Sequence, residues 1–124
     1  MEATDVPFTV LIPTRERAGT LRAAIQSCLN QQVSNLRVVV SDNCSGDDTA
    51  AVVSGFTDQR LEYVNPGRRL SMSANFEFAL EQFRDGYVMH LGDDDGLLPF
   101  ALQRVSGNRI GSTPAQPLSE ALRK

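Results

Sequence analysis

Several residue types are scarce in this chain of 124 residues, and each scarcity argues against a class of protein. The chain has no tryptophan, one histidine and two cysteines, so neither a disulfide framework nor a Cys/His zinc site is expected. Lys124 is the only lysine, and the net charge of -3 argues against a nucleic-acid-binding protein. The length suits one globular domain and little more.

Long apolar runs and common nucleotide-binding motifs are also missing. No stretch approaches the roughly 18 apolar residues that span a bilayer. The N-terminal MEATDVPFTV lacks the basic start and apolar run of a signal peptide. A P-loop, a G-x-G-x-x-G after the first strand and a G-x-S-x-G elbow are absent. We expect the chain in the cytoplasm, or at the inner face of the membrane as a peripheral protein.

Short apolar runs alternate with helical patterns through most of the chain. Strands are expected at residues 7–13, 36–41, 61–64 and 87–91, and helices near 20–29, 50–56, 72–83 and 97–105. The valine-rich runs are continuous, as in strands buried on both faces of a parallel sheet. The pattern predicts an α/β fold with a mostly parallel sheet and helices on both faces.

The alternation stops after Val105. Residues 106–124 hold two prolines and several turn formers, and they predict an irregular tail or a truncated continuation. The expected domain is therefore 1–105. A sheet cut short there would leave an exposed edge, which favours pairing with a second copy.

The helix ends carry recognisable capping residues. Thr20 is a candidate cap for the first helix, and Asp47 and Asp48 for the second. Asn75, in the first turn of the third helix, suits either a cap or a ligand contact. The buried face expected for this third helix consists of Met72, Phe76, Ala79, Leu80 and Phe83.

Three consecutive aspartates, Asp93 to Asp95, directly follow the fourth expected strand. Adjacent carboxylates repel one another, so either the loop is a solvated acidic turn or it holds a cation. Oxygen-rich sites suit Mg²⁺ and Mn²⁺, which use one or two carboxylates together with substrate phosphates. In an extended loop, Asp93 and Asp95 would face one ligand and Asp94 would face elsewhere.

Other polar residues lie at the ends of neighbouring strands. In a sheet ordered 3-2-1-4, the loops after strands one, two and four meet in one crevice, where ligands of open α/β sheets bind. Asp42 could accept hydrogen bonds from a ribose or a base, or could form a local turn. Arg15 and Arg17 could reach a phosphate or a base, or could be surface residues. Arg69 could lie near a diphosphate or in a solvated loop, and His90 is expected to be a sheet residue and not a catalytic base.

Four segments together resemble family 2 glycosyltransferases of the GT-A fold, over about residues 7 to 105. They are FTVLIPTRERAGTLRAAIQSCLNQQ, LRVVVSDNCSGDDT, LSMSANFEFAL and GYVMHLGDDDGLLPFAL, in this order. The resemblance implies a Rossmann-like nucleotide-diphospho-sugar transferase sheet, incomplete at its C-terminal end. The family commonly reads P-x-[YF]-N-R after strand one, and here Thr14-Arg15-Glu16-Arg17 stands in place of the aromatic-Asn pair.

The resemblance also implies roles for individual residues. It implies nucleotide contacts for Pro13, Thr14, Arg15, Arg17, Asp42, Asp93 and Asp94. Arg69, from the loop after the third strand, and Asn75, from the third helix, complete the expected nucleotide-binding set. Asp95 and Asp93 would hold a divalent metal, Mn²⁺ or Mg²⁺, on the donor diphosphate. The catalytic base of this family comes from later in the domain, and Glu120 is the only carboxylate after residue 105.

The implied activity is metal-dependent, inverting transfer of a sugar from a nucleotide-sugar to an acceptor hydroxyl, in polysaccharide biosynthesis of the cell envelope. A UDP-sugar is the favoured donor, and a saccharide, a lipid-linked molecule or another hydroxyl compound is the acceptor. Two alternatives stay open. One is a non-catalytic nucleotide-binding remnant, and the other is a different metal-dependent nucleotide enzyme, such as a nucleotidyltransferase.

Overall fold

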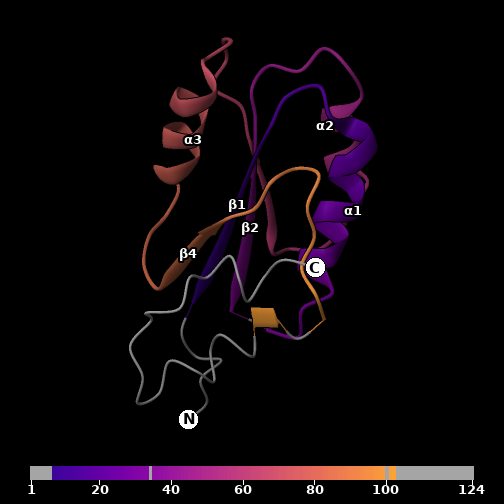
Figure 1. Cartoon of the computed structure of the whole chain (residues 1–124), viewed down its shortest axis with the longest axis vertical. Helices are drawn as coiled ribbons and strands as arrows, with labels where there is room; N and C mark the ends of the chain where they lie inside the picture. The colour runs from indigo at the N-terminus through magenta and orange to yellow at the C-terminus, as the bar shows by residue number, and fades with distance from the viewer. Residues whose placement is uncertain (1–6, 34, 100, 103–124) are drawn as a thin grey trace.

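A computed structural model describes residues 7–33, 35–99 and 101–102. The tail expected over 106–124 lies outside the described residues, and the helix expected over 97–105 lies partly outside them. Four parallel strands form one sheet in the order β3-β2-β1-β4 (Figure 1). The strands are β1 (Phe8–Thr14), β2 (Leu36–Asp42), β3 (Leu61–Val64) and β4 (Tyr87–His90). The parallel α/β fold and the strand order are therefore confirmed.

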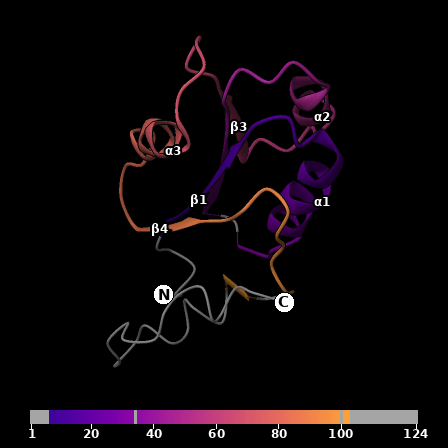
Figure 2. The ribbon, with the colours of Figure 1, turned by 45° about the horizontal axis from the view of Figure 1, so that its top comes forward.

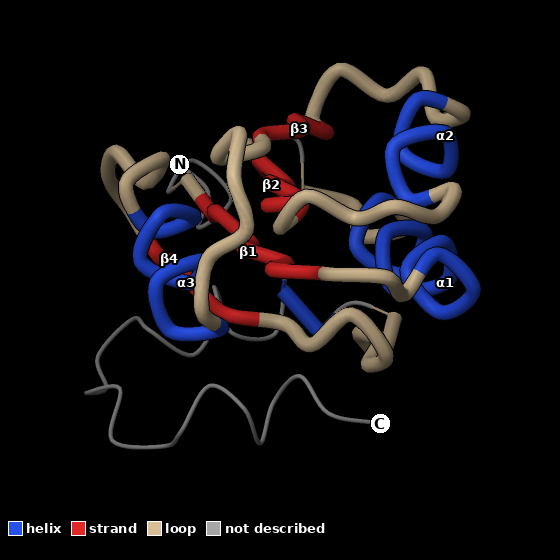
Figure 3. Tube along the Cα trace, turned by 90° about the horizontal axis from the view of Figure 1, so that it is seen from above, coloured by secondary structure: helices blue, strands red, loops and turns tan. Residues whose placement is uncertain are grey.

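Three helices cover the two faces of this sheet. They are α1 (Ala18–Leu29), α2 (Thr49–Ser54) and α3 (Met72–Leu80). Figures 2 and 3 show α1 and α2 together on one face and α3 alone on the other. Within the described ranges, no helix is both long and apolar enough to cross a membrane.

The alternation of side chains along β1 and β2 explains why both faces need helices. Val10 and Ile12 join the larger core cluster with residues of α1 and α2, whereas Leu11 joins a smaller cluster with Ala79 of α3. Successive residues of a strand point to opposite faces, so a continuous apolar run must be covered twice. Cys28 of α1 is fully buried in the larger core, and this burial raises the pKa of its thiol to about 12.

The buried face of α3 differs from the expected one. Met72 is 85% exposed and Leu80 is 40% exposed, whereas Asn75 and Ala79 are buried. The helix is capped by Ser71, whose hydroxyl accepts a hydrogen bond from the Ala74 N–H, so Asn75 is not the cap. The helix also ends at Leu80, so Phe83 lies beyond it and is not part of its buried face.

The start of α1 corrects a second expectation. Thr20 lies inside the helix, and Arg17 occupies the N-cap position without a side-chain capping bond. The first helical N–H, that of Ala18, instead donates to the Asp47 carboxylate 3.2 Å away. A partner distant in sequence replaces the local cap.

We expect Gly86→Ala to destabilise the fold. Gly86 precedes β4 with a φ of +89°, and an added Cβ would lie 2.2 Å from the Pro7 carbonyl oxygen. Backbone strain and this clash should lower the free energy of unfolding by about 1–3 kcal/mol. The matched control is Gly19→Ala within α1, where an added Cβ meets no atom within 4 Å. Urea unfolding should show this control equal to the parent or more stable; equal stability of the two variants would contradict the geometry.

A second prediction concerns the ion pair between Arg37 of β2 and Glu62 of β3, whose two hydrogen bonds are each 2.8 Å long. The hydrogen bond from Arg37 lowers the pKa of Glu62. This stabilisation is therefore present above the unfolded pKa, about 4.3, and is lost as the pH falls through the lowered folded value.

Because the Glu62 side chain is 38% exposed, solvent screening limits the expected loss in Glu62→Gln to about 0.5–1 kcal/mol at neutral pH. Urea unfolding at several pH values should show the difference from the parent shrinking below about pH 4. Glu77→Gln is the control, because it makes the same change at an exposed carboxylate of α3 that forms no ion pair with the described residues. A constant difference for Glu62→Gln would argue against the ion pair.

Candidate functional site

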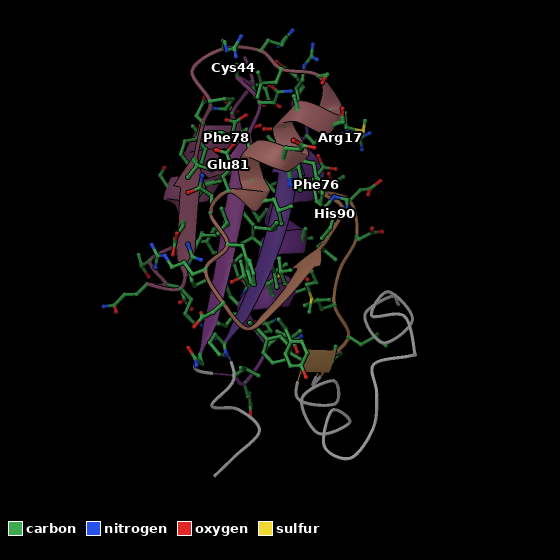
Figure 4. All side chains as sticks on the ribbon, turned by 90° about the vertical axis from the view of Figure 1, so that its left-hand side faces the viewer. Arg17, Cys44, Phe76, Phe78, Glu81 and His90 are labelled. Carbon is green, nitrogen blue, oxygen red and sulfur yellow. The ribbon has the colours of Figure 1, made fainter. Side chains whose placement is uncertain are left out.

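The carboxyl ends of the parallel strands meet at one edge of the sheet. The register pairs Thr14, the last residue of β1, with Asp42, the last residue of β2. On the other side of β1, the Leu91 N–H after β4 donates to the Leu11 carbonyl. The loops after all four strands therefore leave the sheet at the upper end in Figure 1, and Figure 4 places Arg17 and Cys44 at this same end. The convergence expected from the strand order is present.

Direct contacts join the β1 loop to the aspartate run. The Thr14 hydroxyl donates a hydrogen bond of 2.8 Å to Asp93 Oδ2. Arg17 Nη1 lies 3.9 Å from Asp93 Oδ1 and 3.6 Å from Asp94 Oδ2. A guanidinium group thus offsets part of the repulsion between neighbouring carboxylates.

The aspartate run does not alternate as an extended segment would. The Asp95 N–H donates to the Gly92 carbonyl at 3.0 Å, which closes a turn over these residues. The backbone therefore turns here and is not extended as expected, and Asp93 and Asp94 share Arg17. A Cβ on Gly92 would lie 2.7 Å from Asp95 Oδ2, so a larger residue there would displace the Asp95 carboxylate.

Asp42 lies almost fully buried at the end of β2, with 2% of its surface exposed. Its Oδ2 accepts a hydrogen bond of 2.7 Å from the Tyr63 hydroxyl, and its Oδ1 accepts one of 3.0 Å from the Ser45 N–H. Partial burial and the bond to Asp42 raise the pKa of Tyr63, so its hydroxyl stays protonated and donates at neutral pH. The Asn65 amide in turn donates to the Tyr63 oxygen at 3.3 Å. Asp42 therefore forms a local turn, one of the two alternatives left open by the sequence, and also accepts a hydrogen bond from Tyr63 of β3.

Glu16 connects three of the loops. It adopts a φ of +58°, and its N–H donates to the Ser45 hydroxyl at 2.7 Å. Its carboxylate accepts hydrogen bonds from the Gly46 N–H and from Arg69 Nη2, the latter at 3.4 Å. Arg69 Nη2 also donates to the Cys44 carbonyl at 3.3 Å. Arg69 is thereby brought to the crevice from the loop after β3.

Asp47 joins the starts of two helices. One of its oxygens accepts from the Ala18 N–H of α1, and the other accepts from the Thr49 N–H of α2. The hydrogen bond from the Thr49 hydroxyl is the main reason why the pKa of Asp47 lies below its usual range. The expected capping role of Asp47 is confirmed, whereas Asp48 occupies the N-cap position of α2 without a side-chain bond.

Four other candidates lie less directly on the crevice. The Asn75 side chain is buried against β2, where it accepts from the Ser41 hydroxyl at 2.8 Å and donates to the Ser41 carbonyl at 3.1 Å. His90 is an exposed sheet residue whose ring meets Phe76 edge-on at 5.1 Å (Figure 4). Pro13 is half-buried within β1, and Arg15, just after the end of that strand, is exposed.

Sequence reasoning missed Glu16, Tyr63 and Asn65. A signal existed for Tyr63 and Asn65, because both flank the end of an expected strand, where polar groups face the crevice. For Glu16 the signal was a single acidic residue between two arginines. Which loop each of these side chains would contact depends on long-range packing and has no local signature.

Carboxylate oxygens such as those of the aspartate run are ligands that hard divalent cations prefer. Among the described residues, no group of three or more His, Cys, Asp and Glu side chains is arranged to hold a metal ion. Mg²⁺ and Mn²⁺ commonly need only one or two protein carboxylates when phosphate oxygens supply other ligands. Asp93 and Asp95 would be the protein ligands in such a shared site.

Comparison with known proteins gives a family match over most of the chain. The model of the family "Glycosyl transferase family 2" matches residues 9–106. A GalNAc(5)-diNAcBac-PP-undecaprenol beta-1,3-glucosyltransferase of Campylobacter jejuni is 37% identical over 101 residues, which are 79% of this chain and 33% of that protein. The succinoglycan biosynthesis protein ExoO of Rhizobium meliloti is 31% identical over 101 residues, 82% of this chain and 28% of that protein. The chain thus spans about a third of the length of these relatives.

Solved structures share the fold at low sequence identity. S. aureus TarS 1-349 in complex with UDP-GlcNAc has a TM-score of 0.74 and 21% identity, covering 82% of this chain and 30% of that one. The mannosyltransferase PcManGT from Pyrobaculum calidifontis, in complex with GDP-Man and Mn²⁺, has a TM-score of 0.71 and 23% identity, covering 78% and 30%. The GT-A architecture implied by the resemblance is confirmed. The chain belongs to glycosyl transferase family 2.

Proposed function

We propose that this chain forms the nucleotide-sugar-binding part of a metal-dependent, inverting glycosyltransferase. The observation that supports the proposal is the hydrogen-bonded convergence of the loops after all four strands. Thr14 and Asp93 join the loops after β1 and β4. Glu16 and Arg69 join the loops after β1 and β3, and Glu16 also contacts the loop after β2. Ligands of open α/β sheets bind at this edge.

The nucleoside is assigned to the β1–β2–β3 side of the crevice. Asp42 is oriented there by Tyr63 and Ser45, and each carboxylate oxygen keeps a second lone pair for a ribose hydroxyl or a base N–H. Pro13, Thr14 and Arg15 form the adjacent wall of the proposed base site. Asn75 has its amide bonded to Ser41, so its proposed contribution is to support the end of β2.

The diphosphate is assigned to the side of the crevice between Arg69 and the aspartate run. Arg69, with a side chain that is 50% exposed, can exchange its ion pair with Glu16 for a phosphate contact. Asp93 and Asp95 would hold the cation, with Asp94 beside them. When bound, a divalent cation would neutralise charge on the leaving diphosphate.

The proposed reaction breaks the bond between the anomeric carbon and the diphosphate oxygen, and the electron pair leaves with the diphosphate. The acceptor hydroxyl oxygen attacks from the opposite face, which inverts the anomeric configuration, and its proton passes to a general base. We assign no described residue to this base. A UDP-sugar is the favoured donor because TarS binds UDP-GlcNAc, although PcManGT binds GDP-Man. A lipid-linked acceptor is suggested by the name of the Campylobacter jejuni relative.

Asp95→Ala tests the diphosphate side. Thermal shifts of the full chain with UDP, GDP, CDP and dTDP, each with and without Mn²⁺, should show a metal-dependent rise for one nucleotide. At about a hundredfold excess over Kd, a ligand of the folded state stabilises by roughly 2.7 kcal/mol. Asp95→Ala should abolish the metal-dependent part, whereas Glu77→Ala, the same charge change on exposed α3, should keep it. An unchanged metal-dependent shift in Asp95→Ala would refute the assignment.

Tyr63→Phe tests the nucleoside side. Loss of the hydroxyl leaves Asp42 with one partner fewer, so we expect the affinity for the preferred nucleotide to fall about three- to tenfold. The metal requirement should stay, because the diphosphate side is intact. Tyr87→Phe, where the ring stacks on Phe8 at the start of β4, is the matched control. Titration calorimetry that found equal affinities for both variants would show that Tyr63 does not orient the site.

A further inference from the structure

Arg17 occupies an unusual position for a half-exposed arginine. Its guanidinium approaches two members of the aspartate run at once, at 3.6 Å from Asp94 and 3.9 Å from Asp93. The Asp93 side chain is only 15% exposed and is fixed by Thr14, so one of these two carboxylates cannot turn freely into water. The Arg17 guanidinium thus lies against two carboxylates, one of which is already fixed in place.

The contact of Arg17 with Asp93 and Asp94 is weak enough for another cation to replace the guanidinium. Both distances exceed those of a bidentate pair, and the side chains of Arg17 and Asp94 are 53% and 57% exposed. Exposed pairs with such geometry are weak and sensitive to salt. A second cation that approached Asp93 would meet the positive charge of Arg17 and would have to displace it.

We infer that Arg17 is the internal counter-ion of the aspartate run and sets the affinity of this loop for a divalent cation. The guanidinium and the cation compete for the Asp93 carboxylate. The inference rests on the proposed function, which places the cation and the diphosphate at this loop. Arg17 thereby lowers the affinity for the cation alone, and a diphosphate, which offers the displaced arginine a new anionic partner, lessens this penalty.

The test measures Mn²⁺ binding to the full chain by the electron paramagnetic resonance signal of free Mn²⁺, without nucleotide. Arg17→Gln should bind Mn²⁺ about three- to tenfold more tightly than the parent, because it removes both the competitor and its repulsion. Arg17→Lys keeps the charge and should stay within about twofold of the parent. The gain in Arg17→Gln should shrink in about 0.5 M NaCl, because salt screens exposed charges.

Arg68→Gln is the matched control, because it makes the same charge change at an exposed arginine in the loop after β3. Arg68 forms no ion pair with the described residues, so this variant should bind Mn²⁺ like the parent. Equal affinities of Arg17→Gln and Arg68→Gln would overturn the inference. With UDP added, the advantage of Arg17→Gln should become smaller; an advantage that is unchanged or larger would refute the proposed exchange of partners.

The same measurements separate this inference from the proposed function. If Asp95→Ala binds Mn²⁺ and UDP like the parent, the proposed metal site is wrong, whatever the Arg17 variants show. If the parent requires Asp95 for Mn²⁺-dependent binding of UDP but Arg17→Gln gains nothing, only the counter-ion role is wrong. Absence of Mn²⁺ binding in every variant, with and without UDP, would overturn both.

Discussion

The pairing of β1 with strands on both of its sides is the constraint on which the site depends. β1 lies between β2 and β4, and the register brings Thr14 level with Asp42 at the edge where the loops leave the sheet. Because the strands are parallel, their polar ends cannot be distributed over two edges. The helices packed on both sides of the sheet bury both faces of β1, which accounts for its continuous apolar sequence.

At this edge of the sheet, the ion pairs among the described residues join an arginine of one loop to a carboxylate of another loop. Arg17 of the β1 loop faces Asp93 and Asp94, and Arg69 after β3 faces Glu16. These pairs are long, and all their side chains except that of Asp93 are largely exposed, so they hold the loops near one another without the stability of a buried pair. Such an arrangement suits a site for an anionic ligand and its cation, because incoming charges of both signs find partners that are already in place.

Much of this fold was readable from the sequence, because its signals are local. The expected strand at 61–64 coincides with β3. Those at 36–41 and 87–91 differ from β2 and β4 by one residue at one end, and the one at 7–13 is shifted by one residue relative to β1. The errors arose where a distant partner overrides local preference. Thr20 is not the cap of α1, since Asp47 receives the first N–H of that helix. Met72 and Leu80 are exposed, since Asn75 takes the inward position to bind Ser41.

The sequence by itself determined the order of elements, the polar residues that follow each strand and the resemblance to the family that the comparisons confirm. These follow from periodicity and composition, which are properties of neighbouring residues. Only the tertiary structure decided which charges meet. The turn closed by Gly92 and Asp95 directs two aspartates toward Arg17, and the β2–β3 pairing brings Tyr63 to Asp42. Contacts between residues dozens of positions apart depend on how loops pack above the sheet, and no local pattern records that packing.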